Sequence, residues 1–228
     1  MKYAVYFGSR EIYGDMVPAA KSLLANSDVD KIFLLIEDDV FPYELSPTIE
    51  TINISKKIWE WYNPHGPNVK QRWTYIGLIR SALSKVFPDI DKILTIDCDA
   101  IVVEDISDLW NIDIDDFYFA AVKEPTISRM ENMLYTNSGV AMMNLKKLRE
   151  DRKDNEMLLL LNTKPLTFVC QDAMNIVCQS KILQIPNEYN ATNYTGICYH
   201  PKVIHYAGQR QWRNNGIVEK YRRMDWPR

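Results

Sequence analysis

Two aspartates, Asp97 and Asp99, directly follow a short apolar run at 93–96. The run predicts a buried strand, and in an extended chain side chains two residues apart point the same way. No lysine or arginine lies beside these carboxylates in the sequence, and two hard oxygen donors on one side suit a divalent cation. Open α/β sheets bind ligands beyond the carboxyl ends of their strands. The spacing therefore predicts a metal site where this strand ends.

A cation at this point can neutralise a diphosphate and act as a Lewis acid on a leaving group. Two other interpretations stay open. One is a solvated acidic turn, because Glu104, Asp105 and Asp108 follow closely. The other is a phosphatase of the haloacid-dehalogenase type, in which Asp97 attacks phosphorus. The position argues against the phosphatase, because such enzymes resemble one another in opening the chain with this strand.

The composition and charge of the chain limit the number of domains and the classes of partner that we expect. The chain has 228 residues, of which 46% are hydrophobic and 25% charged, as in one large globular domain or two small ones. The net charge of −3 shows no basic excess, so we expect no nucleic-acid partner. No apolar stretch reaches the roughly 18 residues of a membrane span. The N-terminus lacks the pattern of a secretory signal, and the cysteines are scattered, which indicates a reducing, cytoplasmic compartment.

Short apolar runs alternate with longer helical patterns along the chain. This alternation predicts an α/β fold with a mostly parallel central sheet flanked by helices. We expect strands at 3–7, 31–36, 93–96, 101–103, 117–122 and 139–145. We expect helices at 17–25, 69–87, 146–160 and 170–180. The first helix is expected to begin next to Pro18, which a helix tolerates only in its first turn.

Five blocks of the sequence resemble those of one known family and fall in that family's order. They are DIDKILTIDCDAIVVEDISDLW (89–110), NSGVAMMNL (137–145), QDAMN (171–175), IPNEYN (185–190) and PKVIHYAG (201–208). The blocks resemble those of the retaining glycosyltransferases of family 8, the glycogenin and lipopolysaccharide galactosyltransferase group. The resemblance extends over nearly the whole chain.

The resemblance implies a single GT-A domain over 1–228, or one module of a longer polypeptide. It implies transfer of a hexose from a UDP-sugar of the glucose or galactose type, with retention of configuration. The acceptor is then a hydroxyl of a glycan, a lipid-linked sugar or a protein glycan. The implied cofactor is Mn²⁺, or else Mg²⁺, held by Asp97, Asp99 and His205, since carboxylates with an imidazole suit manganese better than calcium. Taken alone, His205 between Ile204 and Tyr206 is typical of a core histidine.

The same resemblance assigns residues to the donor. Arg80, on the predicted helix before the aspartates, is expected to contact phosphate or sugar; it lies beside an apolar stripe, and a buried arginine must be paired. Asn137 is expected to bond the donor sugar or the acceptor. Tyr13 is expected to stack on uracil, the alternative being plain surface packing. The expected donor-binding residues are Gly8, Ser9, Tyr13, Arg80, Asp97, Cys98, Asn137, Ser138, Gly208 and Arg210.

A first departure from the family pattern bears on mechanism. Cys170 stands where the family carries an aspartate, and a cysteine in an apolar setting is usually a small buried hydrophobe. Gln171 keeps its place near the anomeric carbon, and because an amide is a poor nucleophile we expect front-face substitution. Asp172 is expected to hold sugar hydroxyls or the metal shell, or to serve as an acid at a helix start. The expected catalytic residues are Gln171, Asp172 and Arg80.

A second departure follows His205. The family's lysine position is Gln211, so we expect Arg210 to supply the cation for the diphosphate, since a guanidinium binds phosphate at least as well as an ammonium. The tail from 213 is basic and aromatic, which favours a solvated helix face over contact with an anionic membrane. Because of Cys170 and Gln211, a degenerate module that binds UDP-sugars without turnover stays open as an alternative.

Overall fold

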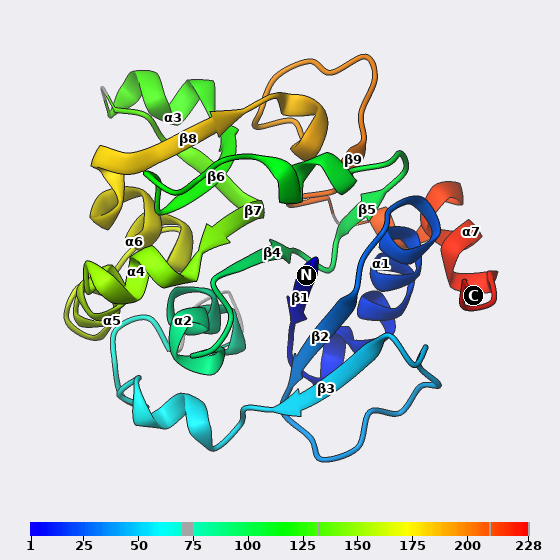
Figure 1. Cartoon of the computed structure of the whole chain (residues 1–228), viewed down its shortest axis with the longest axis horizontal. Helices are drawn as coiled ribbons and strands as arrows, with labels where there is room; N and C mark the ends of the chain where they lie inside the picture. The colour runs from blue at the N-terminus through cyan, green and yellow to red at the C-terminus, as the bar shows by residue number, and fades with distance from the viewer. Residues whose placement is uncertain (70–74, 132, 210, 228) are drawn as a thin grey trace.

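The computed structural model describes residues 1–69, 75–131, 133–209 and 211–227, and in these residues two β-sheets are present (Figure 1). The large sheet has the strand order β3-β2-β1-β4-β7-β6-β8, and β5 pairs with β9 in a small second sheet. In the large sheet β7 is antiparallel to both of its neighbours, whereas the other neighbouring pairs are parallel. The expected mostly parallel central sheet is confirmed.

The elements have the following bounds. The strands are β1 (Tyr3–Phe7), β2 (Lys31–Ile36), β3 (Ile49–Asn53), β4 (Lys92–Ile96), β5 (Ala100–Val102), β6 (Phe119–Lys123), β7 (Thr136–Asn144), β8 (Ile182–Ile185) and β9 (Val203–His205). The α-helices are α1 (Tyr13–Asn26), α2 (Leu83–Val86), α3 (Pro125–Met130), α4 (Leu145–Glu150), α5 (Lys153–Thr163), α6 (Cys170–Val177) and α7 (Gly216–Arg223).

The central strands are apolar throughout because both faces of the sheet are covered. In β1, Ala4 and Tyr6 belong to one core cluster, and Val5 and Phe7 belong to the other. The first cluster contains residues of α1, α7, β5 and β9, and the second contains residues of α2, α4, α5 and α6. Such two-sided burial is typical of parallel strands. The sheet is thus the middle layer, and the carboxyl ends of all its strands except β7 lie at one edge, where open α/β sheets bind ligands.

Several predicted helices differ from the observed ones. Within the expected 69–87 helix, Val69 lies in a turn, and Tyr75–Ala82 forms a 3-10 helix that continues as α2. Residues 70–74 of that prediction lie outside the described part. In a 3-10 helix residues three apart align, and Ile76, Ile79 and Ala82 are all fully buried on that spacing.

Two other helix predictions were wrong in their bounds. The expected 146–160 helix is two helices, α4 and α5, because Arg152 between them has a left-handed backbone with a φ of 55°. The first helix begins at Tyr13 rather than near residue 17, so Pro18 lies inside α1. Proline has no backbone N–H, so the carbonyl of Gly14, four residues earlier in the first turn of α1, receives no helical hydrogen bond from Pro18. Strands β3, β8 and β9 were not predicted from the sequence.

A β-bulge interrupts the pairing of β6 with β7. Ala121 faces Ala141, yet the next residue of β6, Val122, faces Asn137. The segment 138–140 of β7 therefore has no partners on β6. Extra residues of this kind are found next to functional sites, where they redirect side chains. The bulge lies beside the aspartates, since Gly139 accepts a 2.7 Å hydrogen bond from the backbone N–H of Asp97.

The C-terminal segment packs against the first helix, as Figure 1 shows at the red end of the chain. Val218 and Tyr221 of α7 are buried there. Arg213 donates three hydrogen bonds of 2.6–2.9 Å to Asp15, which is buried in α1. The tail was expected to be a solvated helix face, but one face of α7 packs against α1. In the described residues no helix combines the length and the apolar character that crossing a membrane requires.

The Arg213–Asp15 pair should therefore contribute to stability. Arg213→Ala leaves a buried carboxylate without its cation, so we expect a loss of about 2 kcal/mol in the free energy of unfolding and a drop of about 4–8 °C in Tm. Differential scanning calorimetry measures both. The control is Arg223→Ala, because Arg223 pairs with Glu219 on the surface and such pairs contribute little. Equal losses in both variants would contradict this view of the tail.

Candidate active site

The two aspartates meet His205 at the end of β4. Ligand atoms of Asp97, Asp99 and His205 all lie within 4.8 Å of one another. The imidazole Nε2 is 3.2 Å from Asp99 and 3.7 Å from Asp97. The small sheet produces this meeting, since His205 in β9 faces Ala100 in β5 and the N–H of Tyr206 bonds the carbonyl of Asp99. The predicted three-residue cluster is present.

The histidine is fixed in the orientation that a metal ligand needs. Its Nδ1 is 2.8 Å from the amide oxygen of Asn190, which can only accept, so Nδ1 carries a proton and Nε2 is turned to the carboxylates. Metal-bound histidines commonly donate their second ring N–H in this way. Burial lowers the pKa of His205, but Asp99 and Asp97 outweigh burial and leave that pKa raised. Two carboxylates and this imidazole nitrogen are a donor set that fits a divalent cation.

Gly139 makes room for the ring. A Cβ at this position would lie 2.1 Å from Cε1 and 2.6 Å from Nδ1 of His205. His205 is buried and bonded at both ring nitrogens, so moving the ring away from such a Cβ would break those bonds. The glycine in the NSG block is therefore required by packing against the histidine.

Arg80 joins the cluster from the other side. Its guanidinium pairs with Asp97 and donates a 2.7 Å hydrogen bond to the hydroxyl of Ser138. Burial lowers the pKa of Arg80, but Asp97 more than offsets this effect and leaves the pKa raised. The face of its guanidinium lies 4.8 Å from the centre of the Phe7 ring. The expectation of a paired, buried arginine beside the aspartates is confirmed by these contacts.

Gln171 and Asp172 lie in the first turn of α6, and Gln171 is linked to the cluster through Ser138. The side-chain oxygen of Gln171 accepts hydrogen bonds from the backbone N–H of Ser138, at 3.0 Å, and from its hydroxyl, at 3.3 Å. Asp172 accepts hydrogen bonds from the hydroxyl of Tyr135 and from the backbone N–H of Phe168. Among the described residues Asp172 has no bond to the aspartate–histidine cluster; its two bonds hold the start of α6, and its contact with sugar hydroxyls or the metal shell stays a prediction.

Glu124 closes the arrangement and was missed in the sequence. Its carboxylate accepts a 2.6 Å hydrogen bond from Asn137 and a 3.2 Å bond from Gln171. Asn137 in turn accepts a 2.8 Å bond from Asn190. The result is a closed ring of side chains. Its members, in order, are Asp97, Arg80, Ser138, Gln171, Glu124, Asn137, Asn190 and His205.

The remaining donor predictions lie at the end of β1. Gly8 follows this strand and bonds the carbonyl of Leu35. Ser9 is buried, and the buried Tyr13 packs its ring against Phe41 while its hydroxyl donates to Asp38. Among the described residues, none of these three has a hydrogen bond to the ring, and their contact with the donor stays a prediction.

Cys98 links that group to the aspartates, because its thiol is 3.6 Å from the carbonyl of Phe7. Burial and the charges of Asp97 and Asp99 hold the pKa of this thiol well above its usual range. Burial likewise raises the pKa of Cys170, whose sulfur lies 3.9 Å from Arg80. Both cysteines are therefore protonated thiols. This agrees with a packing role for Cys170.

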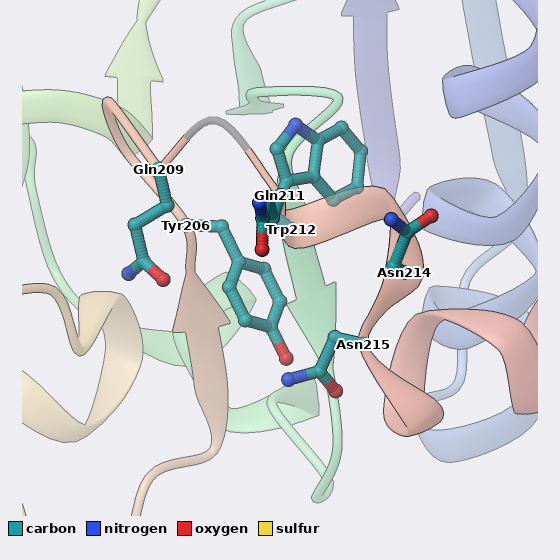
Figure 2. A pocket seen from close by; sticks show the side chains of 6 residues that line it. All are labelled: Tyr206, Gln209, Gln211, Trp212, Asn214 and Asn215. Carbon is teal, nitrogen blue, oxygen red and sulfur yellow. The ribbon is translucent and has the colours of Figure 1, made fainter.

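Two open hollows adjoin the C-terminal side of the cluster. One, of about 520 Å³, has His205 and Gln209 in its wall. The other, of about 500 Å³, includes the stacked rings of Tyr206 and Trp212, and Figure 2 shows amide side chains around these rings. Gly208, which lies between Tyr206 and Trp212 in the sequence, has a φ of 71°, a backbone conformation that favours glycine. The expected phosphate contact, Arg210, lies outside the described residues.

Comparison with known proteins agrees with this geometry. The profile of glycosyl transferase family 8 matches residues 39–216. Glycosyltransferase GlyF of Streptococcus pneumoniae is 24% identical and aligns with 90% of this chain and 55% of its own length. A putative glycosyltransferase of Haemophilus influenzae is 29% identical over 52% of this chain and 40% of its own length. The chain spans about half the length of these curated relatives.

Among solved structures, galactosyltransferase LgtC in complex with donor and acceptor sugar analogs is similar to the chain. The TM-score is 0.75 at 18% identity, over 96% of this chain and 93% of that one. A likeness at this identity concerns the fold alone. The expected GT-A fold is confirmed.

The contact of Gly139 with the histidine leads to a stability prediction. Gly139→Ala should lower the free energy of unfolding by about 1–3 kcal/mol, because a Cβ collides with a fixed ring. The matched control is Gly77→Ala, since a Cβ at Gly77 meets nothing within 4 Å and alanine is the better helix former. Urea unfolding followed by circular dichroism compares the two. A Gly139→Ala protein as stable as wild type would show that the histidine is not held in this place.

The buried Glu124 leads to a pH prediction. Burial raises its pKa, and the hydrogen bonds from Asn137 and Gln171 offset this only in part. The folded protein thus takes up a proton more readily than the unfolded chain, whose glutamates titrate near about 4.3. Stability contributed by the protonated acid is present at low pH and is lost as the pH rises through the raised pKa.

We therefore expect Glu124→Gln to be more stable relative to wild type at pH 8 than at pH 4.5. The quantity compared is the free energy of unfolding of the variant minus that of wild type. Urea unfolding at the two pH values measures it, with Glu131→Gln, an exposed position, as the matched control. A difference that does not change with pH would contradict the raised pKa.

Proposed function

The chain belongs to glycosyl transferase family 8, and on that basis we propose that it is a metal-dependent, retaining hexosyltransferase that uses a UDP-sugar. The acceptor is a hydroxyl of a carbohydrate or glycoconjugate. The observation that carries the proposal is the cluster of Asp97, Asp99 and His205, with an Nε2 turned toward two carboxylates at the end of β4.

Mn²⁺, or Mg²⁺, would be held by this cluster and would supply charge neutralisation for a diphosphate leaving group. Arg80 keeps one oxygen of Asp97 occupied, so the carboxylate is oriented before any ligand binds. The same guanidinium brings a fixed positive charge to the edge of the site. Charges fixed in advance stabilise a transition state without reorganisation.

The sugar-facing side of the proposed site is made of amides. Gln171 and Asn137 share the carboxylate of Glu124, and these bonds fix both side chains. Groups held in this way orient a sugar by its hydroxyls. Gln171 is a poor nucleophile, and Cys170 is a protonated thiol. We therefore favour front-face substitution, in which the acceptor hydroxyl attacks on the face that the diphosphate leaves and the departing phosphate takes the proton.

Release of UDP from a panel of UDP-sugars tests this function. With Mn²⁺ present, one sugar should be hydrolysed above the rest, and EDTA should abolish its hydrolysis. Asp97→Asn and Asp99→Asn should each lower the rate at least about 100-fold, which corresponds to roughly 2.7 kcal/mol of transition-state stabilisation. Asp116→Asn, at an exposed position outside the cluster, is the control.

Each alternative predicts a distinct result. Metal-dependent binding of UDP-sugars without UDP release, with and without acceptors, would favour the degenerate binding module. Phosphate trapped on Asp97 without dependence on UDP would favour a phosphatase, which the family membership argues against. Full activity in both aspartate variants would rule out the metal assignment.

A further inference from the structure

Arg80 is a buried cation that has more hydrogen-bond donors than strong acceptors. Its side chain is 3% exposed, and its guanidinium pairs with Asp97. Nη1 donates to the hydroxyl of Ser138 at 2.7 Å. Among the described residues, the second partner of Nη1 is the thiol of Cys170, at 3.9 Å. Sulfur is a weak acceptor, so on this side the guanidinium can bind a stronger one.

One carboxylate, that of Asp97, is in ion-pair contact with Arg80 among the residues that the structure describes. In the proposed enzyme Asp97 also binds the metal, so one carboxylate then serves two cations. Cys170 stands where the family carries an aspartate, but burial raises the pKa of its thiol, and the thiol brings no charge. Because a buried charge needs close compensation, a ligand that brings a second anion to Arg80 would be favoured.

The contact between Arg80 and Cys170 lies on the sugar side of the proposed site. Oδ1 of Asp97 pairs with Arg80, whereas Oδ2 faces Nε2 of His205, where the metal and the diphosphate are expected. Cys170 is partly exposed and directly precedes Gln171, which is expected near the anomeric carbon. An anion beside Cys170 is therefore expected to belong to the sugar and not to the diphosphate.

A uronic acid supplies an anion of this kind. Its C6 is a carboxylate, where glucose and galactose carry a hydroxymethyl group. A hydrogen bond to an ionised group is about twice as strong as one between neutral groups, so Arg80 would favour the carboxylate over a hydroxyl. The side chain of Cys170 is shorter than that of an aspartate and leaves room for the added oxygen. An aspartate at this position would repel the same ligand.

We propose that the donor sugar is a hexuronic acid, whose carboxylate binds Arg80 at the place that Cys170 leaves without a charge. This inference rests on the proposed function and specifies its donor. Cys170 then determines specificity, because a neutral side chain at 170 removes the repulsion by which an aspartate would exclude the uronate.

The donor preference of wild type and of Cys170→Asp tests the inference. The donors are UDP-glucuronate, UDP-galacturonate, UDP-glucose and UDP-galactose, each with Mn²⁺. Isothermal titration calorimetry measures the Kd of each donor, and UDP release measures its turnover. In wild type one uronate should bind at least about tenfold more tightly than the neutral sugar of the same configuration. Cys170→Asp should reverse this preference, because the new carboxylate pairs with Arg80 and repels that of the donor.

Two control variants separate the position of the charge from its mere presence. Cys170→Ser keeps a small neutral side chain and should retain the preference for the uronate. Ile176→Asp adds the same charge to α6 at a side chain that is 51% exposed, and it should also retain the preference. An equal reversal in Ile176→Asp would show a general effect of charge and contradict the role of Cys170. Circular dichroism checks that each variant is folded, and the wild-type comparison decides the matter if Cys170→Asp does not fold.

The outcomes distinguish this inference from the proposed function. Tighter binding of a neutral UDP-sugar by wild type, or an unchanged preference in folded Cys170→Asp, would overturn the inference. Metal-dependent UDP release from the neutral sugar would then leave the proposed function standing. Preferential binding of a uronate without UDP release, with and without acceptors, would support the inference and contradict the transferase. Binding of none of the four donors would overturn both.

Discussion

The carboxylate of Glu124 accepts hydrogen bonds, and this fixes the direction of every hydrogen bond from Glu124 to His205. Glu124 accepts from Asn137, so the oxygen of that amide turns to Asn190, and the oxygen of Asn190 turns to His205. Each amide donates its N–H to one neighbour and accepts a hydrogen bond from the next. The oxygen of Asn190 is the last acceptor, so Nδ1 of His205 must carry a proton. The nitrogen left facing the aspartates is Nε2. An acid at the end of β6 thereby decides the chemistry available at the end of β4.

Two irregular features of the sheet, the antiparallel strand β7 and its bulge, position the side chains that make these hydrogen bonds. β7 runs against both neighbours, so its early residues, and not its last ones, reach the edge where β4 ends. The bulge then turns Asn137 and Ser138 to opposite branches of the ring: Asn137 toward Glu124, and Ser138 between Arg80 and Gln171. A regular strand places successive side chains on opposite faces of the sheet. The bulge lets neighbouring residues serve one site.

The spacing of the two aspartates after an apolar run predicted a metal site from local chemistry, whereas His205 and Arg80 were predicted through the resemblance to the family's sequence blocks. Glu124 and Asn190 were not predicted to act, since their importance lies in partners far along the chain. An acid two residues after the predicted strand 117–122 was the signal available for Glu124. The break at Arg152 was missed because a single residue with a left-handed backbone has no signature of its own in the sequence, although residues 149–156 around it are all polar or charged. The sheet order follows from pairings that no local pattern encodes.

The small β5–β9 sheet makes the site a property of the finished chain. Asp99 and its strand are synthesised early, whereas the imidazole arrives on a strand from near the other end and is held there by backbone bonds to β5. Contacts between distant segments form late, since a long loop must close first. A nascent chain that has emerged only as far as β8 carries the aspartates and Arg80 without their third partner. The cluster of Asp97, Asp99 and His205 is therefore complete only after β9 has paired with β5, and a translation product that ends before β9 lacks the imidazole.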